Sequence, residues 1–272
     1  MTARELTKDT TLCISLSGRP SNVGTRFHNH LYGELGLDFV YKAFTTDDLP
    51  AAIAGIRGLG IRGCGVSMPF KEAVIPLVDE LEPSAAAIGA VNTIVNDGGR
   101  LVASNTDYLA LAELLAEVDR ALPAVVLGSG GMAKAAVAAL RDGGFADVTV
   151  VARNAVSGPE LADRYGARWA AELGDRRPGL LLNATPVGMA GGPEADDLPV
   201  PEAALATVRV VLDVVAVPPE TPLVRAARTA GATTITGDRV IALQAAEQFA
   251  RYTGVRPSDE QLARASTVSR PT

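Results

Sequence analysis

The chain has 272 residues, of which 47% are hydrophobic and 21% are charged, a composition typical of globular proteins rather than disordered ones. A net charge of −6 excludes a large basic surface, so we expect a small-molecule partner and no nucleic acid. Two cysteines and two histidines favour neither a disulfide framework nor a metal site, and no apolar run is long enough to cross a membrane. Because no signal peptide is recognisable, we expect a cytoplasmic protein. For a chain of this size we expect either a monomer or a homodimer.

Short β-branched runs alternate with Ala- and Leu-rich segments of helical period, which predicts an α/β fold with a mainly parallel sheet. The first elements are predicted in the order strand 12–16, helix 26–35, strand 39–44, helix 49–57, strand 63–68 and helix 71–81. Two further strands, 93–95 and 101–103, flank Asn96-Asp97-Gly98-Gly99, whose residues favour a tight hairpin turn.

A new series of elements begins with a helix at 108–118. Pro123 then precedes strand 124–127, which ends on glycines that open another helix. The later strands are predicted at 148–151, 180–182, 208–214 and 233–235. We therefore expect a Rossmann-type dinucleotide-binding domain at 108–237, and a substrate-binding α/β domain formed discontinuously by 1–107 and 238–272.

The glycine turn that follows strand 124–127 fits the pattern G-x-G-x-x-A at a junction of strand and helix, which is the context that dinucleotide binding requires. The predicted cofactor residues are Gly128, Ser129, Gly130, Gly131, Met132 and Ala133. Here the first glycine takes the tight turn, the second lets the pyrophosphate approach, and the alanine allows close packing of helix on strand. The alternative is a glycine-rich turn that binds no ligand.

The end of strand 148–151 predicts which dinucleotide binds. NAD-binding proteins usually place an acidic residue there for the ribose 2′-hydroxyl, whereas this chain has Arg153. A guanidinium pairs well with a 2′-phosphate, so NADP is favoured over NAD. Asn154 and Ser157 offer further hydrogen bonds, and the alternative is that Arg153 is simply a solvated side chain.

Four polar residues suggest a second site: Lys71, Asn92, Asp107 and Gln244. A lysine in the first turn of a helix opposes the helix dipole, so Lys71 lacks an obvious structural reason. Asp107 has one as the N-cap of a helix that begins at Tyr108, and Asn92 and Gln244 have ordinary explanations in a turn and on a helix surface. A lysine and an aspartate beside a nicotinamide would move the proton of a hydroxyl while hydride leaves the adjoining carbon.

Together, six ordered motifs resemble the shikimate dehydrogenase family over nearly the whole chain. They are Gly65-Val66-Ser67-Met68-Pro69-Phe70-Lys71, Ala90-Val91-Asn92-Thr93, Ser104-Asn105-Thr106-Asp107, Gly128-Ser129-Gly130-Gly131, Asn183-Ala184-Thr185-Pro186-Val187-Gly188-Met189 and Leu243-Gln244-Ala245-Ala246. The resemblance implies reversible NADP-dependent reduction of 3-dehydroshikimate to shikimate, a step of aromatic amino acid biosynthesis, with the substrate in a cleft facing the nicotinamide. It implies that Lys71 and Asp107 are the catalytic pair and that Ser67, Asn92 and Gln244 bind substrate. It also implies that Val214 and Gly237 line the nicotinamide pocket.

The chain departs from the family pattern at the serine pair that binds the substrate carboxylate. Where the family has Ser-x-Ser-Pro shortly before a histidine, this chain offers Ser21, Asn22 and Thr25 before His28. Any of the three could contact the substrate. Ser15 and Ser17 form a similar pair, but they precede the turn that matches the family's Gly-Asn-Pro, so we reject that alignment.

Further departures change positions that select the substrate. A tyrosine that normally touches substrate is replaced by Ala216, and Arg239 and Val240 replace a glycine and a methionine. These changes resemble the divergent shikimate dehydrogenase-like branch of the family. Weak activity on shikimate, a dehydrogenase for quinate or a related ring hydroxy acid, and a non-catalytic regulatory module that binds NADP or a ring acid all remain open.

Overall fold

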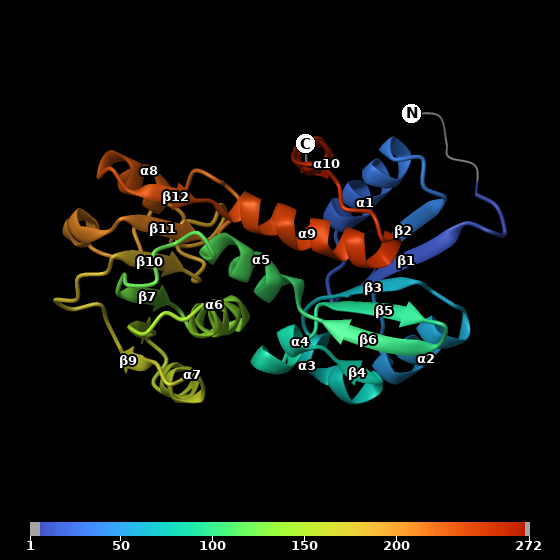
Figure 1. Ribbon diagram of the computed structural model, residues 1–272, viewed down its shortest axis with the longest axis horizontal. Coiled ribbons are helices and arrows are strands. Elements are labelled where there is room, and N and C mark those ends of the chain that lie inside the picture. Colours follow the sequence, from blue (N-terminus) through green and yellow to red (C-terminus); the bar gives the residue numbers. More distant parts are fainter. Residues whose placement is uncertain (1–5, 270–272) are drawn as a thin grey trace. The chain divides into compact units, whose positions relative to one another are not determined.

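A computed structural model describes residues 6–269, and its contacts divide the chain into two compact units. Unit 1 comprises Met1–Thr106 and Gln244–Thr272, and unit 2 comprises Asp107–Leu243. The chain therefore returns to unit 1 at Gln244, whereas the sequence placed this return at 238. Each unit has its own sheet (Figure 1).

Unit 1 is built on a mixed sheet in the order β2-β1-β3-β5-β6-β4. β2, β1 and β3 are parallel, β5 is antiparallel to both β3 and β6, and β4 is parallel to β6. The elements up to β6 are β1 (Thr11–Leu16), α1 (Asn22–Glu34), β2 (Phe39–Phe44), α2 (Leu49–Gly58), β3 (Gly63–Val66), α3 (Phe70–Ala73), η1 (Ile75–Leu77), β4 (Glu80–Leu81), α4 (Pro83–Ile88), β5 (Thr93–Asp97) and β6 (Arg100–Ser104). The later helices of this unit are the C-terminal part of α9 (Gly237–Thr253) and α10 (Asp259–Ser269).

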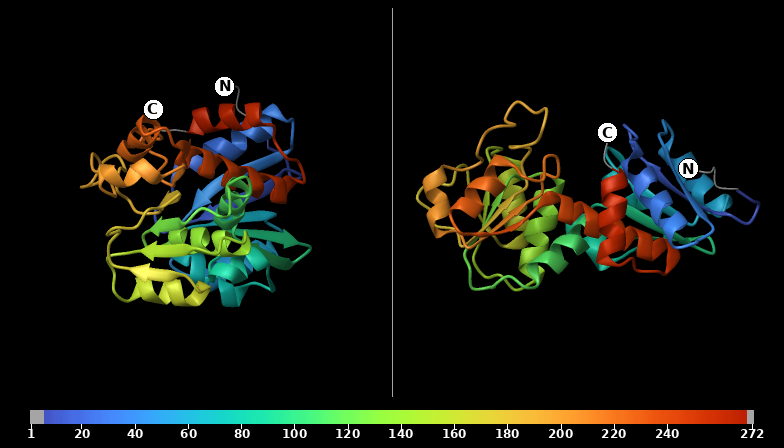
Figure 2. Two further views of the ribbon diagram at one scale, coloured as in Figure 1. Left: turned by 60° about the vertical axis from the view of Figure 1, so that its left-hand side comes forward. Right: turned by 90° about the horizontal axis from the view of Figure 1, so that it is seen from above.

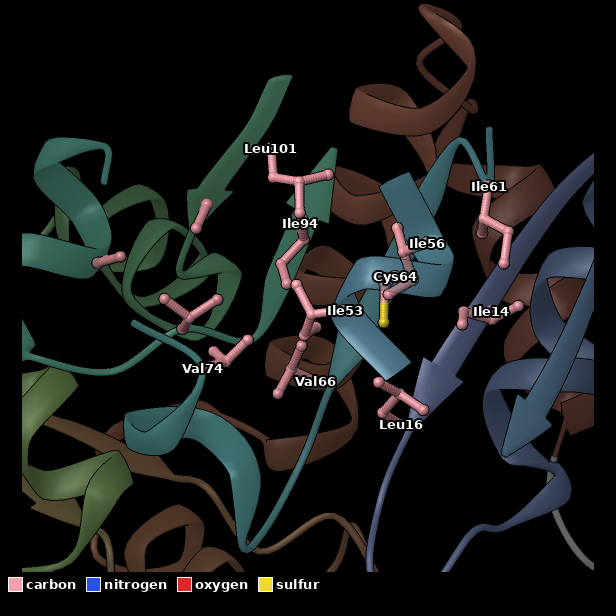
Figure 3. Packing of buried hydrophobic residues seen from close by; sticks show 13 residues of the cluster. Ile14, Leu16, Ile53, Ile56, Ile61, Cys64, Val66, Val74, Ile94 and Leu101 are labelled. Carbon is pink, nitrogen blue, oxygen red and sulfur yellow. The ribbon is translucent and has the colours of Figure 1, made fainter. Parts of the chain in front are cut away.

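The two faces of this sheet bury different sets of side chains, because successive residues of a strand point to opposite faces. Ile14 and Leu16 of β1 pack in a cluster with residues of α2 (Figure 3). Cys13, from the same strand, packs instead in a cluster with residues of α1, α9 and α10. α1 and α10 lie side by side over this second face (Figure 2). Gly63 leaves room for the ring of Tyr252, which any Cβ at this position would overlap.

The predicted helix 71–81 is wrong. α3 is a single turn, a 3-10 turn follows it, and the segment then ends in β4. Pro76 explains the interruption, because proline removes a backbone donor and its ring clashes with the carbonyl four residues earlier. The dipole argument for Lys71 therefore fails, since a one-turn helix has little dipole. Asn92 does not end a helix either, because α4 ends at Ile88 with Gly89 in the left-handed region at φ 63°.

Unit 2 has a fully parallel sheet in the order β12-β11-β10-β7-β8-β9. This is the Rossmann order. The first strand, β7, lies at the centre, β8 and β9 follow on one side of it, and β10, β11 and β12 follow on the other side. The predicted Rossmann-type fold is therefore confirmed. Its elements are α5 (Thr106–Leu115), β7 (Ala124–Leu127), α6 (Gly131–Asp142), β8 (Val148–Val151), α7 (Ser157–Tyr165), β9 (Arg168–Ala170), β10 (Leu180–Asn183), η2 (Glu202–Thr207), β11 (Val210–Asp213), α8 (Pro222–Thr229), β12 (Thr233–Ile235) and the start of α9.

A buried polar network fixes the loops that follow β10 and β11. The Asp213 carboxylate is inaccessible to solvent and accepts hydrogen bonds from Asn183 Nδ2 at 3.0 Å, Val215 N at 3.0 Å and Thr221 Oγ1 at 2.6 Å. Burial raises the pKa of Asp213, and these hydrogen bonds act in the opposite direction. The network holds both loops at the carboxyl edge of the sheet, where ligands bind in open α/β folds.

Candidate active site

A cavity of about 760 Å³ opens at the carboxyl edge of the unit 2 sheet. Its walls come from the ends of β7 and β8, the segment after β9 and the loop after β10. It therefore includes the point between β7 and β10 where the strand order reverses, the position that binds dinucleotides in Rossmann folds. The volume lies within the range of about 300–1,000 Å³ that is usual for small-molecule sites.

The glycine turn forms one wall of this cavity. Gly128 has φ 104°, and a Cβ there would lie 3.0 Å from the Ala184 carbonyl oxygen, so the turn itself requires glycine. Gly130 has an ordinary φ of −80°, and an added Cβ would have no described neighbour within 4 Å beyond the adjoining residues. This open space beside the backbone is what a pyrophosphate needs. Ser129 Oγ lies 2.7 Å from Ser157 Oγ, which links the turn to α7.

The remaining predicted residues of the turn lie at the start of α6. Gly130 is the N-cap, and Gly131, Met132 and Ala133 form the first turn, whose N–H groups favour an anion. Ala133 is completely buried, as close packing of the helix on the sheet requires. These residues fit a dinucleotide held by its phosphates.

Val214 and Gly237 lie beyond β11 and β12, and the structure brings them together. A Cβ on Gly237 would overlap the carbonyl oxygens of Val214 and Val215, so only glycine allows this approach. Gly128, Ser129, Gly130 and Arg153 line the cavity, whereas Val214 and Gly237 lie outside its described lining.

Arg153 lines the cavity two residues after β8, with its side chain 82% exposed. Its Nη1 lies 3.5 Å from a carboxylate oxygen of Glu194, which comes from the loop after β10 and also lines the cavity. The adjacent Asn154 uses Oδ1 to accept hydrogen bonds from the backbone N–H groups of Val156 and Ser157. Its oxygen therefore serves the turn that leads into α7.

Asn92 is the centre of the predicted substrate site in unit 1. Its side chain is buried, and Oδ1 accepts a hydrogen bond from Thr106 N at 2.8 Å and from Thr93 Oγ1 at 2.9 Å. Within residues 6–269, its Nδ2 has no hydrogen-bond partner. Burying an amide donor without a partner costs about 1–3 kcal/mol, so this atom is a strong candidate to bind a ligand oxygen.

Backbone hydrogen bonds gather the other predicted residues around Asn92. The Lys71 carbonyl accepts from Val91 N at 2.8 Å, which places the lysine backbone beside the residue that precedes Asn92. Val66 N donates to the Asn92 carbonyl at 2.8 Å, and Ser67 is the next residue along the chain. Likewise, Asp107 directly follows Thr106, the partner of Asn92 Oδ1.

Asp107 is not the N-cap that the sequence predicted. α5 begins at Thr106, so Asp107 lies in the first turn of the helix.

The structure adds one residue that the sequence did not indicate. Gln248 is buried, and its Nε2 donates to the Asn92 carbonyl at 3.1 Å and to Thr93 Oγ1 at 2.9 Å. The predicted Gln244 lies one helical turn earlier in α9, so both glutamines share a face of this helix. The sequence spacing could have indicated Gln248, because residues four apart in a helix lie on the same face as each other.

The three candidates for the altered serine segment lie at the start of α1. Ser21 is the N-cap, but its side chain makes no capping hydrogen bond, and Asn22 is exposed. Thr25 Oγ1 is buried and has no hydrogen-bond partner within the described residues. Gly18 N donates to the Met68 carbonyl at 2.9 Å, which ties the loop before α1 to the segment after Ser67. Ser15 and Ser17, the pair rejected from the sequence, have partners within the protein. The side chain of Ser15 forms a hydrogen bond with that of Tyr41, and Ser17 Oγ accepts one from Arg19 N.

Residues 6–269 offer neither a clustered metal site nor a membrane span. Within them, no group of three or more His, Cys, Asp or Glu side chains could hold a metal ion. No helix in that range combines the length and the apolar character needed to span a membrane.

Comparison with known proteins relates the chain to one family. A sequence model of the shikimate dehydrogenase substrate binding domain matches residues 22–94. A shikimate dehydrogenase-like protein of Haemophilus influenzae is 52% identical over 267 residues, which cover 97% of this chain and 98% of that protein.

Solved structures of two enzymes show the same architecture. Shikimate 5-dehydrogenase from Thermus thermophilus, in complex with NADP(H) and shikimate, has a TM-score of 0.84 and 30% identity, with 96% of this chain and 100% of that chain covered. Quinate dehydrogenase from Corynebacterium glutamicum, in complex with NAD, has a TM-score of 0.86 and 27% identity, with 95% and 98% covered.

Proposed function

The chain belongs to the shikimate dehydrogenase family, and from this we propose that it is an NADP-dependent dehydrogenase that interconverts 3-dehydroshikimate and shikimate. The observation that carries the proposal is the convergence on Asn92. Its buried, unpartnered Nδ2 lies among segments that also carry Lys71, Ser67 and Asp107. Most buried polar side-chain atoms in proteins have a hydrogen-bond partner, so the unpartnered Nδ2 supports a ligand at this position.

In this proposal unit 2 holds the cofactor. Gly128 and Gly130 would admit the pyrophosphate, the N-terminus of α6 would face its charge, and Arg153 would pair with the 2′-phosphate. When bound, the nicotinamide supplies the hydride for reduction and accepts it in the reverse direction.

The chain's own residues handle the proton and the orientation of the ring. Lys71 Nζ would donate a proton to the carbonyl oxygen as the carbon–hydrogen bond forms, and would remove it from the hydroxyl in the oxidative direction. Asp107 would orient the lysine and favour its charged form. Ser67, Asn92 Nδ2 and the Gln244 amide would hold the ring hydroxyls. One or more of Ser21, Asn22 and Thr25 would supply donors for the ring carboxylate.

An assay of shikimate-dependent NADPH formation, in which the absorbance of NADPH is measured, tests the proposal. Lys71→Ala should lower kcat by at least about a hundredfold, because general acid–base catalysis contributes that much or more. Lys42→Ala is the matched control, since it removes the same charge from an exposed position on β2 of the same unit. An unchanged rate in Lys71→Ala would exclude the assigned role.

The second candidate is a dehydrogenase for quinate or a related ring hydroxy acid. It is favoured by Ala216, which stands after β11 where the family has a tyrosine, and by the similarity to a quinate dehydrogenase. A panel of shikimate, quinate and other ring acids, each tested with NADP and NAD, distinguishes the two candidates. Tight binding of a dinucleotide without turnover of any acid would instead favour a non-catalytic module.

A further inference from the structure

The cavity beside the glycine turn carries more negative than positive side chains. Among the described residues that line it, Arg153 is the one cation, whereas Glu172 and Glu194 are anions. A phosphate monoester carries between about −1.5 and −2 charges at pH 7, so recognition of a 2′-phosphate would depend on this single guanidinium.

Arg153 already has a partner across the cavity. Its Nη1 lies 3.5 Å from the Glu194 carboxylate, whose side chain is 34% exposed. The backbone holds Glu194 in place, because its carbonyl accepts from Gly188 N at 2.9 Å and from Asp197 N at 3.3 Å. These hydrogen bonds fix the backbone from which the Glu194 carboxylate extends toward Arg153.

A carboxylate and a phosphate bind the same face of a guanidinium through the same parallel N–H bonds. A 2′-phosphate that pairs with Arg153 therefore competes with Glu194 for the guanidinium. The 2′-hydroxyl of NAD needs no cation, so this competition does not lower the affinity for NAD. The competition therefore reduces the difference in affinity between NADP and NAD.

We propose that Glu194 is a specificity-determining residue, which competes with the 2′-phosphate of NADP for Arg153 and so lowers the preference for NADP. This inference rests on the proposed function, because it requires that the cavity binds a nicotinamide dinucleotide. An exposed ion pair changes an equilibrium constant by up to about fivefold, which sets the size of the effect.

Isothermal titration of NADP⁺ and NAD⁺ into the protein tests the proposal without depending on turnover. Glu194→Gln should tighten NADP⁺ by about three- to fivefold and leave NAD⁺ within about 1.5-fold. Glu220→Gln is the matched control, because Glu220 forms a similarly exposed ion pair with Arg228 in the same unit but outside the cavity. It should change neither dissociation constant.

The same change in an Arg153→Ala background shows whether the effect passes through the arginine. There, Glu194→Gln should alter NADP⁺ binding by less than about twofold. An unchanged ratio of the two dissociation constants in the single variant, or an equal gain for NAD⁺, would overturn the role of Glu194 but leave the proposed function standing. If neither dinucleotide binds the wild-type protein, both proposals fail.

Discussion

The side chain of Gln248 contacts the main chain of Asn92: Gln248 Nε2 donates a hydrogen bond to the Asn92 carbonyl oxygen at 3.1 Å. The same nitrogen donates to Thr93 Oγ1 at 2.9 Å, and that hydroxyl donates in turn to Asn92 Oδ1. One glutamine therefore fixes both the backbone and the side chain of Asn92. Because Oδ1 is occupied, the free Nδ2 of Asn92 has a defined direction.

We predict that Gln248→Leu weakens substrate binding without weakening cofactor binding. The substitution removes the donor for two buried acceptors, which should lower the free energy of unfolding by about 1–3 kcal/mol. Loss of the fixed Asn92 orientation should raise the KM for shikimate about tenfold, since a misplaced hydrogen bond costs about 1.4 kcal/mol. The dissociation constant of NADP should stay the same, because the cavity that we propose for it is lined by residues of unit 2.

Urea unfolding, steady-state kinetics and NADP titration measure the three quantities. Gln261→Leu is a suitable control, because Gln261 lies in the same unit and its side chain forms hydrogen bonds near the surface, with Ser258 N and with Glu34. A uniform loss of affinity for substrate and cofactor in Gln248→Leu would indicate general destabilisation instead of a positioning role.

Two alanine substitutions in the glycine turn separate folding from ligand binding. Gly128→Ala places a Cβ at φ 104° and 3.0 Å from the Ala184 carbonyl, and should lower the free energy of unfolding by about 1–3 kcal/mol. Gly130→Ala has an allowed φ and open space around the new Cβ, so its stability should stay within about 1 kcal/mol of the wild type.

NADP binding is the second property to compare between the two variants. Gly130→Ala should weaken NADP binding at least about tenfold despite its normal stability, because the Cβ would occupy the space that we propose for the pyrophosphate. Chemical denaturation and NADP titration on both variants provide the measurement. Wild-type affinity in Gly130→Ala would mean that the turn does not hold a pyrophosphate.

β7 and β8 have the predicted bounds because each is a buried run that contains β-branched residues, and β12, an edge strand, was found from Thr233, Thr234 and Ile235. β9, the other edge strand, was missed because Arg168–Ala170 contains no β-branched residue. The helix predicted at 71–81 does not form, because Pro76 interrupts a segment that otherwise has helical periodicity. In each case a local signal was either strong enough to decide the element or was overruled by one residue.

The candidate sites were predictable only where a motif carried them. Gly128 and Gly130 stand in a pattern whose spacing has a mechanical reason, and Arg153 is defined by its place after a strand. Gln248 acts on Asn92, which lies 156 residues away in sequence, so only the fold brings the two together. Glu194 likewise reaches Arg153 from the loop after β10, whose path no periodicity describes.

His28 gives the protein a predictable sensitivity to acid. Its imidazole is buried and stacked on the ring of Tyr41 with centroids 4.4 Å apart, and burial lowers the pKa of His28 to about 3. An unfolded histidine has a pKa of about 6.5, so the unfolded chain binds the proton more readily. The stabilisation is therefore complete above about pH 6.5 and is lost as the pH falls toward about 3.

We predict that His28→Phe removes this component, because phenylalanine keeps an aromatic ring beside Tyr41 but cannot bind a proton. Relative to the variant, the wild-type free energy of unfolding should fall by about 1.4 kcal/mol per pH unit, or about 3 kcal/mol between about pH 6.5 and 4. Urea unfolding across that range measures the difference. Parallel curves for the wild type and His28→Phe would show that His28 is not buried in its neutral form.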